Sequence, residues 1–286
     1  STFSQNSASD ASGAPTDSAD VYGVQVPVVV DPGAERRDFL SRENRDRFDS
    51  FIGNLVDAAT GAFVGQFSAM SIEGGRSLEF PLRYNSLLTN ARGSMGIGWS
   101  HPYEATIRGD ANGIMTVHWD ANRKNSFEFT NDRATPYRGL DEAVRYATLQ
   151  RPTDNISHWE LVMQDGTIYR FLGDGRLSYV ANKIKQKIEL IYSGDRLETL
   201  REPITGYDID LSYNAKGLVS KLTDDALREV RFGYDARDRL TSVSNPSAPG
   251  ESGNPVRYTY ASGEFPKAGQ LLKAMDSQNK QLYANT

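Results

Sequence analysis

The sequence predicts an all-β fold in which tandem β-hairpins lie side by side in one curved sheet. Three observations predict it. Apolar residues recur in sets of three at a spacing of two, the sets recur every 21 residues from residue 167 onward, and turns rich in Gly and Asp separate them. A spacing of two places side chains on one face of a strand, and self-similarity at a fixed period is typical of repeat architectures. Because a single hairpin is only marginally stable, successive hairpins are expected to pair into a continuous sheet.

The composition limits the classes of function. With 286 residues, of which 38% are hydrophobic, the chain can form a large core. The net charge of -5 is not gathered into long runs, which argues against nucleic acid or an anionic membrane as the main partner. Cysteine is absent, which excludes disulfides, thiolate metal sites and a cysteine nucleophile. No window has the roughly 18 consecutive apolar residues of a spanning helix, so we expect no membrane span. From the distribution of charge, we expect no nucleic-acid partner.

The amino-terminal 52 residues predict two segments. Residues 1–20 are rich in Ser, Ala, Asp and Gly, which predicts a flexible leader because such a segment buries too little apolar area to become ordered. Residues 21–52 predict an extended arm, VYGVQVPVVV, interrupted by Pro27, and then a short helix. The helix is predicted because four apolar residues follow i, i+3, i+4, i+7 spacing. They are Phe48, Phe51, Ile52 and Leu55.

Residues 53–166 predict a β-rich opening region. Short alternating runs are separated by glycines up to about Arg108, and the crowding of glycine before a large ring indicates tight backbone turns beside an anchor. The expected anchors of this region are Pro81, Tyr84, Gly96, Gly98 and Trp99. Two hairpins should follow. One pairs 114–119 with 126–129, and the other leads from Trp159, Leu161 and Met163 through Asp165-Gly166 into Thr167.

The repeats predicted over residues 167–286 contain five sets of apolar residues. The sets are Thr167, Tyr169 and Phe171; Ile188, Leu190 and Tyr192; Ile209, Leu211 and Tyr213; Val230, Phe232 and Tyr234; and Val256, Tyr258 and Tyr260. The last set follows after 26 residues because of the insertion NPSAPGESGNP. The residues between set members, such as Glu189 and Arg231, are mostly polar. One face of each strand is therefore expected to be buried and the other solvated.

A leucine follows each of the first four sets after a short turn, and we expect it to begin the return strand. These leucines are Leu177, Leu197, Leu218 and Leu240, and Leu271 follows the fifth set after a longer segment. One repeat thus predicts a strand, a turn, a return strand and a link to the next unit. The last repeat is interrupted after Tyr283, so we expect these residues to be the amino-terminal part of a longer protein.

The turn sequences YDARDRL, YSGDRL and YNAKGL resemble the YD or Rhs repeats of bacterial toxins, insecticidal toxin-complex components and teneurins. The runs VDAATGAF, FPLRYNS and GSMGIGWSHPYE are similar to the opening region of the same proteins. Together these matches cover roughly residues 53 to 283. The resemblance implies that the strands form a ribbon that spirals into a hollow shell around a cargo polypeptide, usually a toxic domain at the far carboxy terminus. Members of that design also have a downstream self-cleaving core, which nothing in this chain matches.

Candidate catalytic and metal-binding residues are few. The three histidines, His101, His118 and His158, lack the spacing of a zinc site and are expected to be structural. Ser100-His101 follows the Gly-rich turn, but no G-x-S-x-G motif accompanies it. The Asp-Gly groups lack the acidic ladder of a calcium loop and are interpreted as turns. We therefore expect no catalytic residue, no bound metal and no cofactor.

Two periodic rows of side chains leave alternatives open. The repeated tyrosines would either pack on the buried face, with each hydroxyl bonded to a partner or water, or form a carbohydrate-stacking surface. Arginines in three turns would either bind an anionic partner or bond a turn carboxylate in an adjacent hairpin. The arginines are Arg176, Arg196 and Arg239, and the carboxylates are Asp174, Asp195 and Asp235. Packing and ion pairing are the preferred interpretations.

These observations lead us to expect a non-enzymatic structural module. The resemblance implies the amino-terminal portion of an Rhs-type shell, secreted or at the cell surface of a bacterium, that encapsulates or chaperones a toxic domain until delivery. Its implied partners are the remainder of the same protein, with its downstream shell and toxin cargo, and a secretion-apparatus component or chaperone. The alternative is an extracellular teneurin-like adhesion or carbohydrate-binding scaffold, and an enzyme is the third hypothesis.

Overall fold

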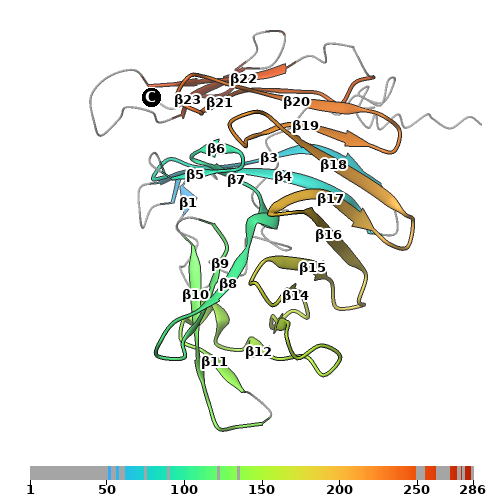
Figure 1. Cartoon of the computed structure of the whole chain (residues 1–286). Helices are drawn as coiled ribbons and strands as arrows, with labels where there is room; N and C mark the ends of the chain where they lie inside the picture. Colours follow the sequence, from blue (N-terminus) through green and yellow to red (C-terminus); the bar gives the residue numbers. More distant parts are fainter. Residues whose placement is uncertain are drawn as a thin grey trace, which may run out of the picture.

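A computed structural model describes residues 51–52, 56–57, 62–73, 76–88, 91–120, 123–133, 136–248, 255–261, 271–275, 278 and 281–284. Within these residues the regular structure is β-strand apart from two short 3-10 helices, η1 and η2 (Figure 1). The all-β class expected from the sequence is confirmed. The leader expected over 1–20 and nearly all of the segment 21–52 lie outside the described residues.

The opening region contains these elements: β1 (Phe51–Ile52), β2 (Val56–Asp57), β3 (Ala62–Ile72), β4 (Leu78–Asn85), β5 (Arg92–Gly93), β6 (Gly96–Ile97), β7 (Trp99–Ser100), η1 (Pro102–Glu104), β8 (Thr106–Gly109), β9 (Met115–His118), β10 (Lys124–Phe129), β11 (Tyr137–Gly139), η2 (Glu142–Val144), β12 (Thr148–Gln150) and β13 (Trp159–Val162). The repeats contain β14 (Ile168–Phe171), β15 (Leu177–Ala181), β16 (Lys187–Ser193), β17 (Arg196–Glu202), β18 (Tyr207–Tyr213), β19 (Val219–Asp224), β20 (Glu229–Tyr234), β21 (Leu240–Ser244), β22 (Pro255–Tyr260), β23 (Leu271–Met275) and β24 (Gln281–Ala284).

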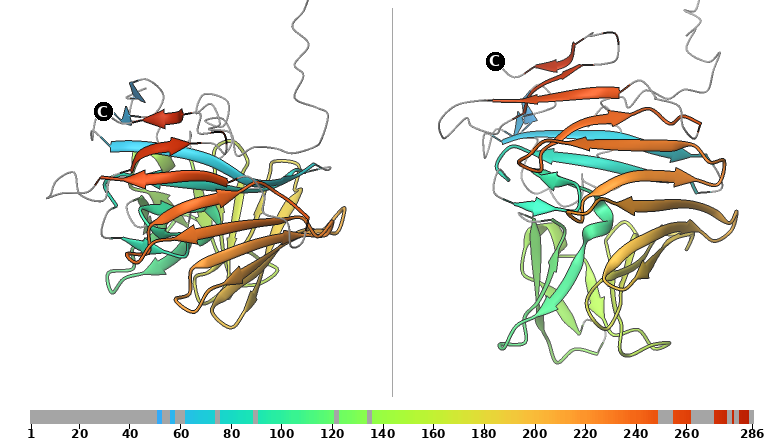
Figure 2. Two further views of the ribbon diagram at one scale, coloured as in Figure 1. Left: turned by 90° about the horizontal axis from the view of Figure 1, so that it is seen from above. Right: turned by 45° about the horizontal axis from the view of Figure 1, so that its top comes forward.

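Strands β8 to β24 form one antiparallel meander in which each strand pairs with the next in the chain. Both hairpins expected upstream of the repeats are present, with Val117 opposite Asn125 and Leu161 opposite Tyr169. The meander curves strongly (Figure 2). The start of the meander lies against a later turn: the amide of Ile107 in β8 donates to the carbonyl of Gly175 at 2.8 Å.

The repeat strands alternate between buried and solvated side chains as the spacing of two predicts. In β16, for example, Ile188 and Leu190 are buried and Glu189 between them is partly exposed. The pairing register then shifts just before the third member of each set, at Phe171, Tyr192, Tyr213, Tyr234 and Tyr260. Such a bulge bends the strand and increases its twist, which accounts for a curved rather than a flat sheet.

A second, smaller sheet covers the apolar face of the hairpins. It has the order β1-β2-β3-β4-β7, and its long strands β3 and β4 lie across the layer formed by β17 to β20 (Figures 1 and 2). Leu78, Phe80 and Leu82 of β4 are buried with the repeat residues in a single core. The opening region therefore fills the space that faces the first hairpins.

The helix expected up to Ile52 is corrected at its end. Phe51 and Ile52 form strand β1, paired with Asp57 and Val56, and β2 pairs in turn with β3. The i, i+3, i+4 spacing is ambiguous over so short a run, and pairing with an adjacent sheet overrides local propensity. The other residues of that expected helix lie outside the described part of the chain.

One repeat position also differs from the register expected when the repeats of this chain are compared with one another. Leu177, Leu197 and Leu240 each pair with the third member of a set, but in the third repeat the partner of Tyr213 is Val219, not Leu218. The physical reason lies in the turn. The carbonyl of Leu218 accepts the amide of Asn214 at 2.8 Å, as the carbonyls of Arg176 and Arg239 accept the first amides of their own turns. Leu218 thus occupies an arginine position.

Candidate functional site

The candidate site is the seam along which the opening region meets the hairpin turns. We define the turn rim as the four turns 172–176, 193–196, 214–218 and 235–239, which lie at the same end of successive hairpins. Besides the bond from Ile107 to Gly175, the amide of Val219 donates to the carbonyl of Ser94 at 2.9 Å, and the amide of Ile97 donates to the carbonyl of Asp238 at 2.9 Å. Backbone from the opening region is therefore bonded along the rim.

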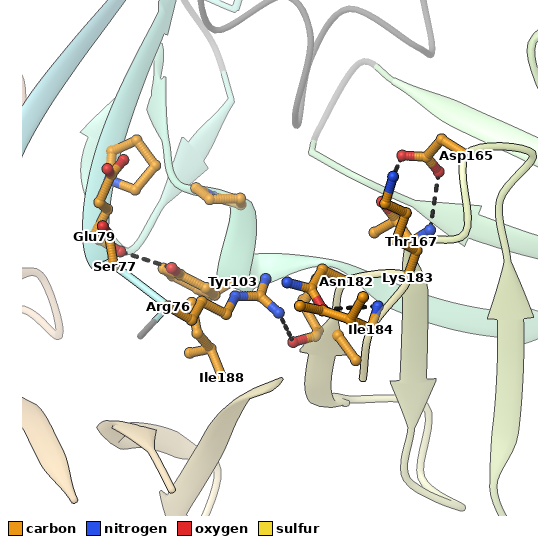
Figure 3. Close-up of a pocket in the computed structure, with 14 residues that line it drawn as sticks. Arg76, Ser77, Glu79, Tyr103, Asp165, Thr167, Asn182, Lys183, Ile184 and Ile188 are labelled. Atoms are coloured by element: carbon orange, nitrogen blue, oxygen red, sulfur yellow. Dashed lines mark hydrogen bonds between the residues drawn. The ribbon is translucent and has the colours of Figure 1, made fainter. Parts of the chain in front are cut away.

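At the opposite ends of the strands, a cavity of about 590 Å³ separates the opening region from the repeats (Figure 3). Arg76 reaches from the loop before β4 and donates to the carbonyl of Val180 at 2.9 Å and to that of Gln186. The Tyr103 hydroxyl donates to the carbonyl of Glu79 at 2.6 Å, and burial raises the pKa of that hydroxyl. Arg76 thus joins the opening region to the repeats beside this cavity, while the bond of Tyr103 lies within the opening region.

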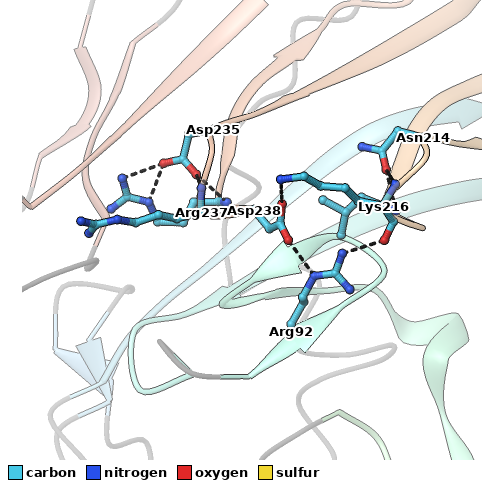
Figure 4. Close-up of polar contacts among 8 residues, drawn as sticks. Arg92, Asn214, Lys216, Asp235, Arg237 and Asp238 are labelled. Carbon is cyan, nitrogen blue, oxygen red and sulfur yellow. Dashed lines mark hydrogen bonds and ion pairs between the residues drawn. The ribbon is translucent and has the colours of Figure 1, made fainter.

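A cluster of charged side chains joins the opening region to two turns of the rim (Figure 4). Arg92 donates to the carboxylate of Asp238 at 2.9 Å and to the carbonyl of Lys216 at 2.7 Å, while the Lys216 ammonium contacts Asp238 at 2.6 Å. Hydrogen bonds from Lys216 and Arg92 lower the pKa of Asp238. Arg92 and Asp238 are 146 residues apart, and no local pattern in the sequence indicates that they meet.

The tyrosines that are third members of the last four repeat sets each tie their hairpin to the one before it. The hydroxyls of Tyr192, Tyr213 and Tyr234 donate to the carbonyls of Leu177, Leu197 and Val219 at 2.8, 2.6 and 2.7 Å, and Tyr260 donates to Leu240. Burial raises the pKa of these phenols, to about 12 for Tyr213. We call these four residues the tie tyrosines. Their hydroxyls bond the protein itself.

Substituting a tie tyrosine by phenylalanine should weaken the fold modestly. Tyr213→Phe leaves the ring in place but deprives the Leu197 carbonyl of its donor, and we expect a loss of about 0.5–1.5 kcal/mol in the free energy of unfolding. Urea denaturation measures it. Tyr207→Phe is the control, because that side chain is exposed and its change should lie within about 0.5 kcal/mol. Equal effects of the two substitutions would contradict the role of the tie.

The remaining sequence-predicted repeat positions lie on the buried face. Tyr169, Phe171, Leu190, Leu211, Phe232, Tyr258, Leu177, Leu197, Leu218 and Leu240 are all buried. The turn arginines lie over the tie tyrosines, with guanidinium carbons 4.6, 5.5 and 4.7 Å from the ring centroids for Arg176, Arg196 and Arg239. Arg176 and Arg239 also pair with Asp174 and Asp235, both at 2.6 Å. The expected ion pairing is thus present, but within one turn rather than between adjacent hairpins, because the turn brings both ends of its own segment together.

The expected anchors of the opening region meet at the rim. The Trp99 indole donates to the Tyr260 hydroxyl at 2.8 Å and lies 5.2 Å from the Tyr84 ring centroid and 4.9 Å from that of Tyr258. The Tyr84 hydroxyl accepts the amide of Leu271 at 2.8 Å, and burial raises its pKa to about 12. Pro81, in contrast, lies in β4 and lines the cavity at the opposite ends of the strands.

Gly96 and Gly98 have φ of +91° and +78°, which favours glycine. A Cβ on Gly96 would overlap the Asp238 carbonyl oxygen, and one on Gly98 would lie 2.9 Å from the Tyr84 ring. The two glycines let the loop approach the repeats closely.

His101 does lie beside a serine, but it is Ser94 and not Ser100. The Ser94 hydroxyl is 3.0 Å from Nε2 of His101, and Glu104 contacts both the hydroxyl and that same nitrogen, at 3.6 Å from the nitrogen. In a Ser-His-acid triad the acid contacts the opposite ring nitrogen. The Ser94 amide also donates to Glu104 at 2.9 Å, so this group positions the loop that reaches Val219.

His101 should make stability sensitive to pH. Burial lowers its pKa below 6.5, against the opposing effect of Glu104, so the unfolded state takes up a proton first as pH falls. Its contribution is complete above about pH 6.5 and is lost as pH drops toward the folded-state pKa, by at most about 1.4 kcal/mol per pH unit. Urea midpoints at about pH 7.5 and 5.5 should therefore differ more for the parent chain than for His101→Gln. His118, whose pKa is also lowered by burial, gives the comparison variant His118→Gln. An unchanged pH dependence in His101→Gln would refute the assignment.

The Asp-rich turns use their carboxylates internally. Asp110 accepts the amides of Asn112 and Ile114, each at 2.9 Å, and Asp165 accepts that of Thr167 at 2.9 Å. Turn chemistry accounts for these residues. Across the described ranges, three or more His, Cys, Asp or Glu side chains do not gather as a metal site would require. The same residues include no helix that is long and apolar enough to cross a membrane.

Comparisons with known proteins match both parts of the chain. Residues 53–127 match the family described as "Domain of unknown function (DUF6531)", and residues 213–248 match the family described as "RHS Repeat". No curated protein matches the sequence. The solved structure described as "Crystal Structure of TcdB2-TccC3-TEV" aligns with 12% identity and a TM-score of 0.31, over 82% of this chain and 16% of that chain. The RHS Repeat match contains β19, β20 and β21, which belong to the units of the 21-residue period. Residues 213–248 therefore contain an RHS repeat, in agreement with the resemblance of the turn sequences to the Rhs/YD-repeat family.

Proposed function

We propose that this chain is a closed wall of an Rhs-type shell, which encloses a carboxy-terminal toxic domain until that domain is delivered. One observation carries the proposal. The apolar face of the first hairpins is covered by β3 and β4 of the same chain, and the seam is bonded along the turn rim. A hairpin sheet whose apolar face is covered can enclose a cargo, whereas a sheet with an exposed apolar face would bind polypeptides indiscriminately.

The proposed partners follow from the same containment. They are the remainder of the same protein, with its downstream shell and toxic cargo, and a secretion-apparatus component or chaperone. Export from a bacterium is part of this proposal. Residues 53–166 would serve as the closing region, and residues 167–286 as the first repeats of the wall.

Protease protection tests containment. The full reading frame that includes this segment is expressed with a tag on its carboxy-terminal domain, and the domain should survive a protease concentration that digests it when it is made alone. Phe80→Asp, which buries a charge in the seam, should make the domain cleavable. Phe129→Asp is the control, because Phe129 is exposed. Cleavage of the domain at the same rate inside and outside the parent protein would exclude containment.

The alternative of an adhesion or carbohydrate-binding scaffold makes a different prediction. The tie tyrosines are unsuited to sugar stacking, because their hydroxyls bond carbonyls of the chain and arginines lie over three of their rings. Among the described residues, the available aromatic faces are the exposed rings at Phe129, Tyr146 and Tyr207. Glycan-array binding that is lost in Phe129→Ala or Tyr146→Ala would favour the scaffold over the shell.

A further inference from the structure

Three of the four turns of the turn rim have an arginine at the same position, and the fourth has a leucine. Wherever a tie tyrosine bonds Leu177, Leu197 or Leu240, the residue just before that leucine is an arginine that lies over the ring. For Tyr234, which bonds Val219, the corresponding residue is Leu218. The third repeat is therefore the one in this row that carries an apolar side chain at the arginine position.

The loop of the opening region occupies this same place. Ser94 accepts the amide of Val219, the residue that follows Leu218, and a Cβ on Gly96 would lie 3.2 Å from the Tyr234 ring. Leu218 is fully buried, whereas the side chain of Arg176 is 28% exposed. The loop thus covers Leu218 and Tyr234, whereas in the other three hairpins a partly exposed arginine lies over the tie tyrosine.

We propose that Leu218 is a positioning residue that selects the β18–β19 hairpin as the seat of the opening region. An arginine at this position would have to lose its hydration under the loop, and a buried charge is stable only when it is fully paired. A leucine gains from the same burial. The ion cluster of Arg92, Lys216 and Asp238 closes over the seat, but it is exposed, and exposed pairs contribute little.

This choice of repeat has a structural consequence. The turns 172–176, 214–218 and 235–239 are closed by the same bond from the amide of the first residue to the carbonyl of the fifth, so these backbones alone cannot specify the register. A single apolar position breaks the equivalence and sets where β3 and β4 cross the sheet. The inference concerns assembly of the chain and does not depend on whether a cargo is enclosed.

Hydrogen exchange on the whole chain gives the first test. In Leu218→Arg, we expect the amides of Ile97 and Val219 to exchange about tenfold faster or more, while the amide of Leu161 in distant β13 keeps its protection. Leu218→Met, which stays apolar, should leave all three amides unchanged. A folded Leu218→Arg with parent-like protection at Ile97 and Val219 would overturn the proposal.

The second test asks whether the effect of Leu218→Arg on the urea midpoint changes sign when the loop is displaced. It remains informative if Leu218→Arg alone fails to fold. Gly96→Ala should expel the loop, since its Cβ would overlap the Asp238 carbonyl. With the loop gone, an arginine can lie over Tyr234 as its counterparts do, so Gly96→Ala/Leu218→Arg should have a higher urea midpoint than Gly96→Ala. If Leu218 is only a core residue, the arginine will lower the midpoint in both backgrounds, which refutes the selection.

Discussion

Replacing Trp99 by alanine is expected to lower the free energy of unfolding by about 3–5 kcal/mol, the range typical of large-to-small substitutions of buried rings. The side chain is only 2% exposed and packs against Tyr84 and Tyr258. Its loss also deprives the Tyr260 hydroxyl of the indole donor. Because Trp99 joins the opening region to the hairpin beyond β21, the cost combines a cavity with a weakened seam. Urea or thermal denaturation measures it.

Trp99→Phe separates these two contributions. It keeps an aromatic ring between Tyr84 and Tyr258 but removes the hydrogen bond to Tyr260, so it should recover most of the packing and still lose roughly 1 kcal/mol relative to the parent chain. The anchor role would have to be abandoned if Trp99→Ala destabilised the chain by less than about 1 kcal/mol.

Phe80→Ala should have a comparable effect, about 3–5 kcal/mol, at the centre of the covered face. Phe80 is fully buried on β4, with its ring centroid 4.8 Å from His101 and 6.1 Å from Tyr103. Its removal leaves a cavity in the core that the small sheet shares with the repeats. Equilibrium unfolding in urea gives the cost, and binding of a hydrophobic dye should increase if the two layers separate.

Phe129→Ala is the matched control, because it makes the same chemical change at a ring that is 61% exposed. Its loss should be small and confined to the edge contact with Tyr137. Similar costs at the two positions would mean that β4 does not seal the apolar face of the repeats.

Local chemistry made much of this structure predictable. The spacing of two in Ile188, Leu190 and Tyr192 defines a strand with one buried face whatever surrounds it, and Asp165-Gly166 defines a hairpin turn. The repetition of these features every 21 residues then requires a sheet of hairpins. The glycines before Trp99 similarly predicted a tight turn beside an anchor.

Predictions failed where one local sequence pattern was compatible with two structures. Phe51 and Ile52 fit a helical spacing, but pairing with β2 makes them a strand. Leu218 fits the spacing of the strand-initiating leucines, but the turn places it one position earlier and gives that role to Val219. A shift of one residue reverses the face of a strand, and only the hydrogen bonds of the turn determine which residue comes first.

The sequence by itself determined the class of fold, the repeating unit and the face of each hairpin that is buried, because these depend on side chains a few residues apart. The tertiary structure alone decided that β3 and β4 cover that face, that Arg92 meets Asp238, and that Tyr84 accepts the amide of Leu271, a residue 187 positions away. Contacts at such separations depend on how the curved sheet brings its hairpins back past the opening region, and no short-range periodicity encodes that path.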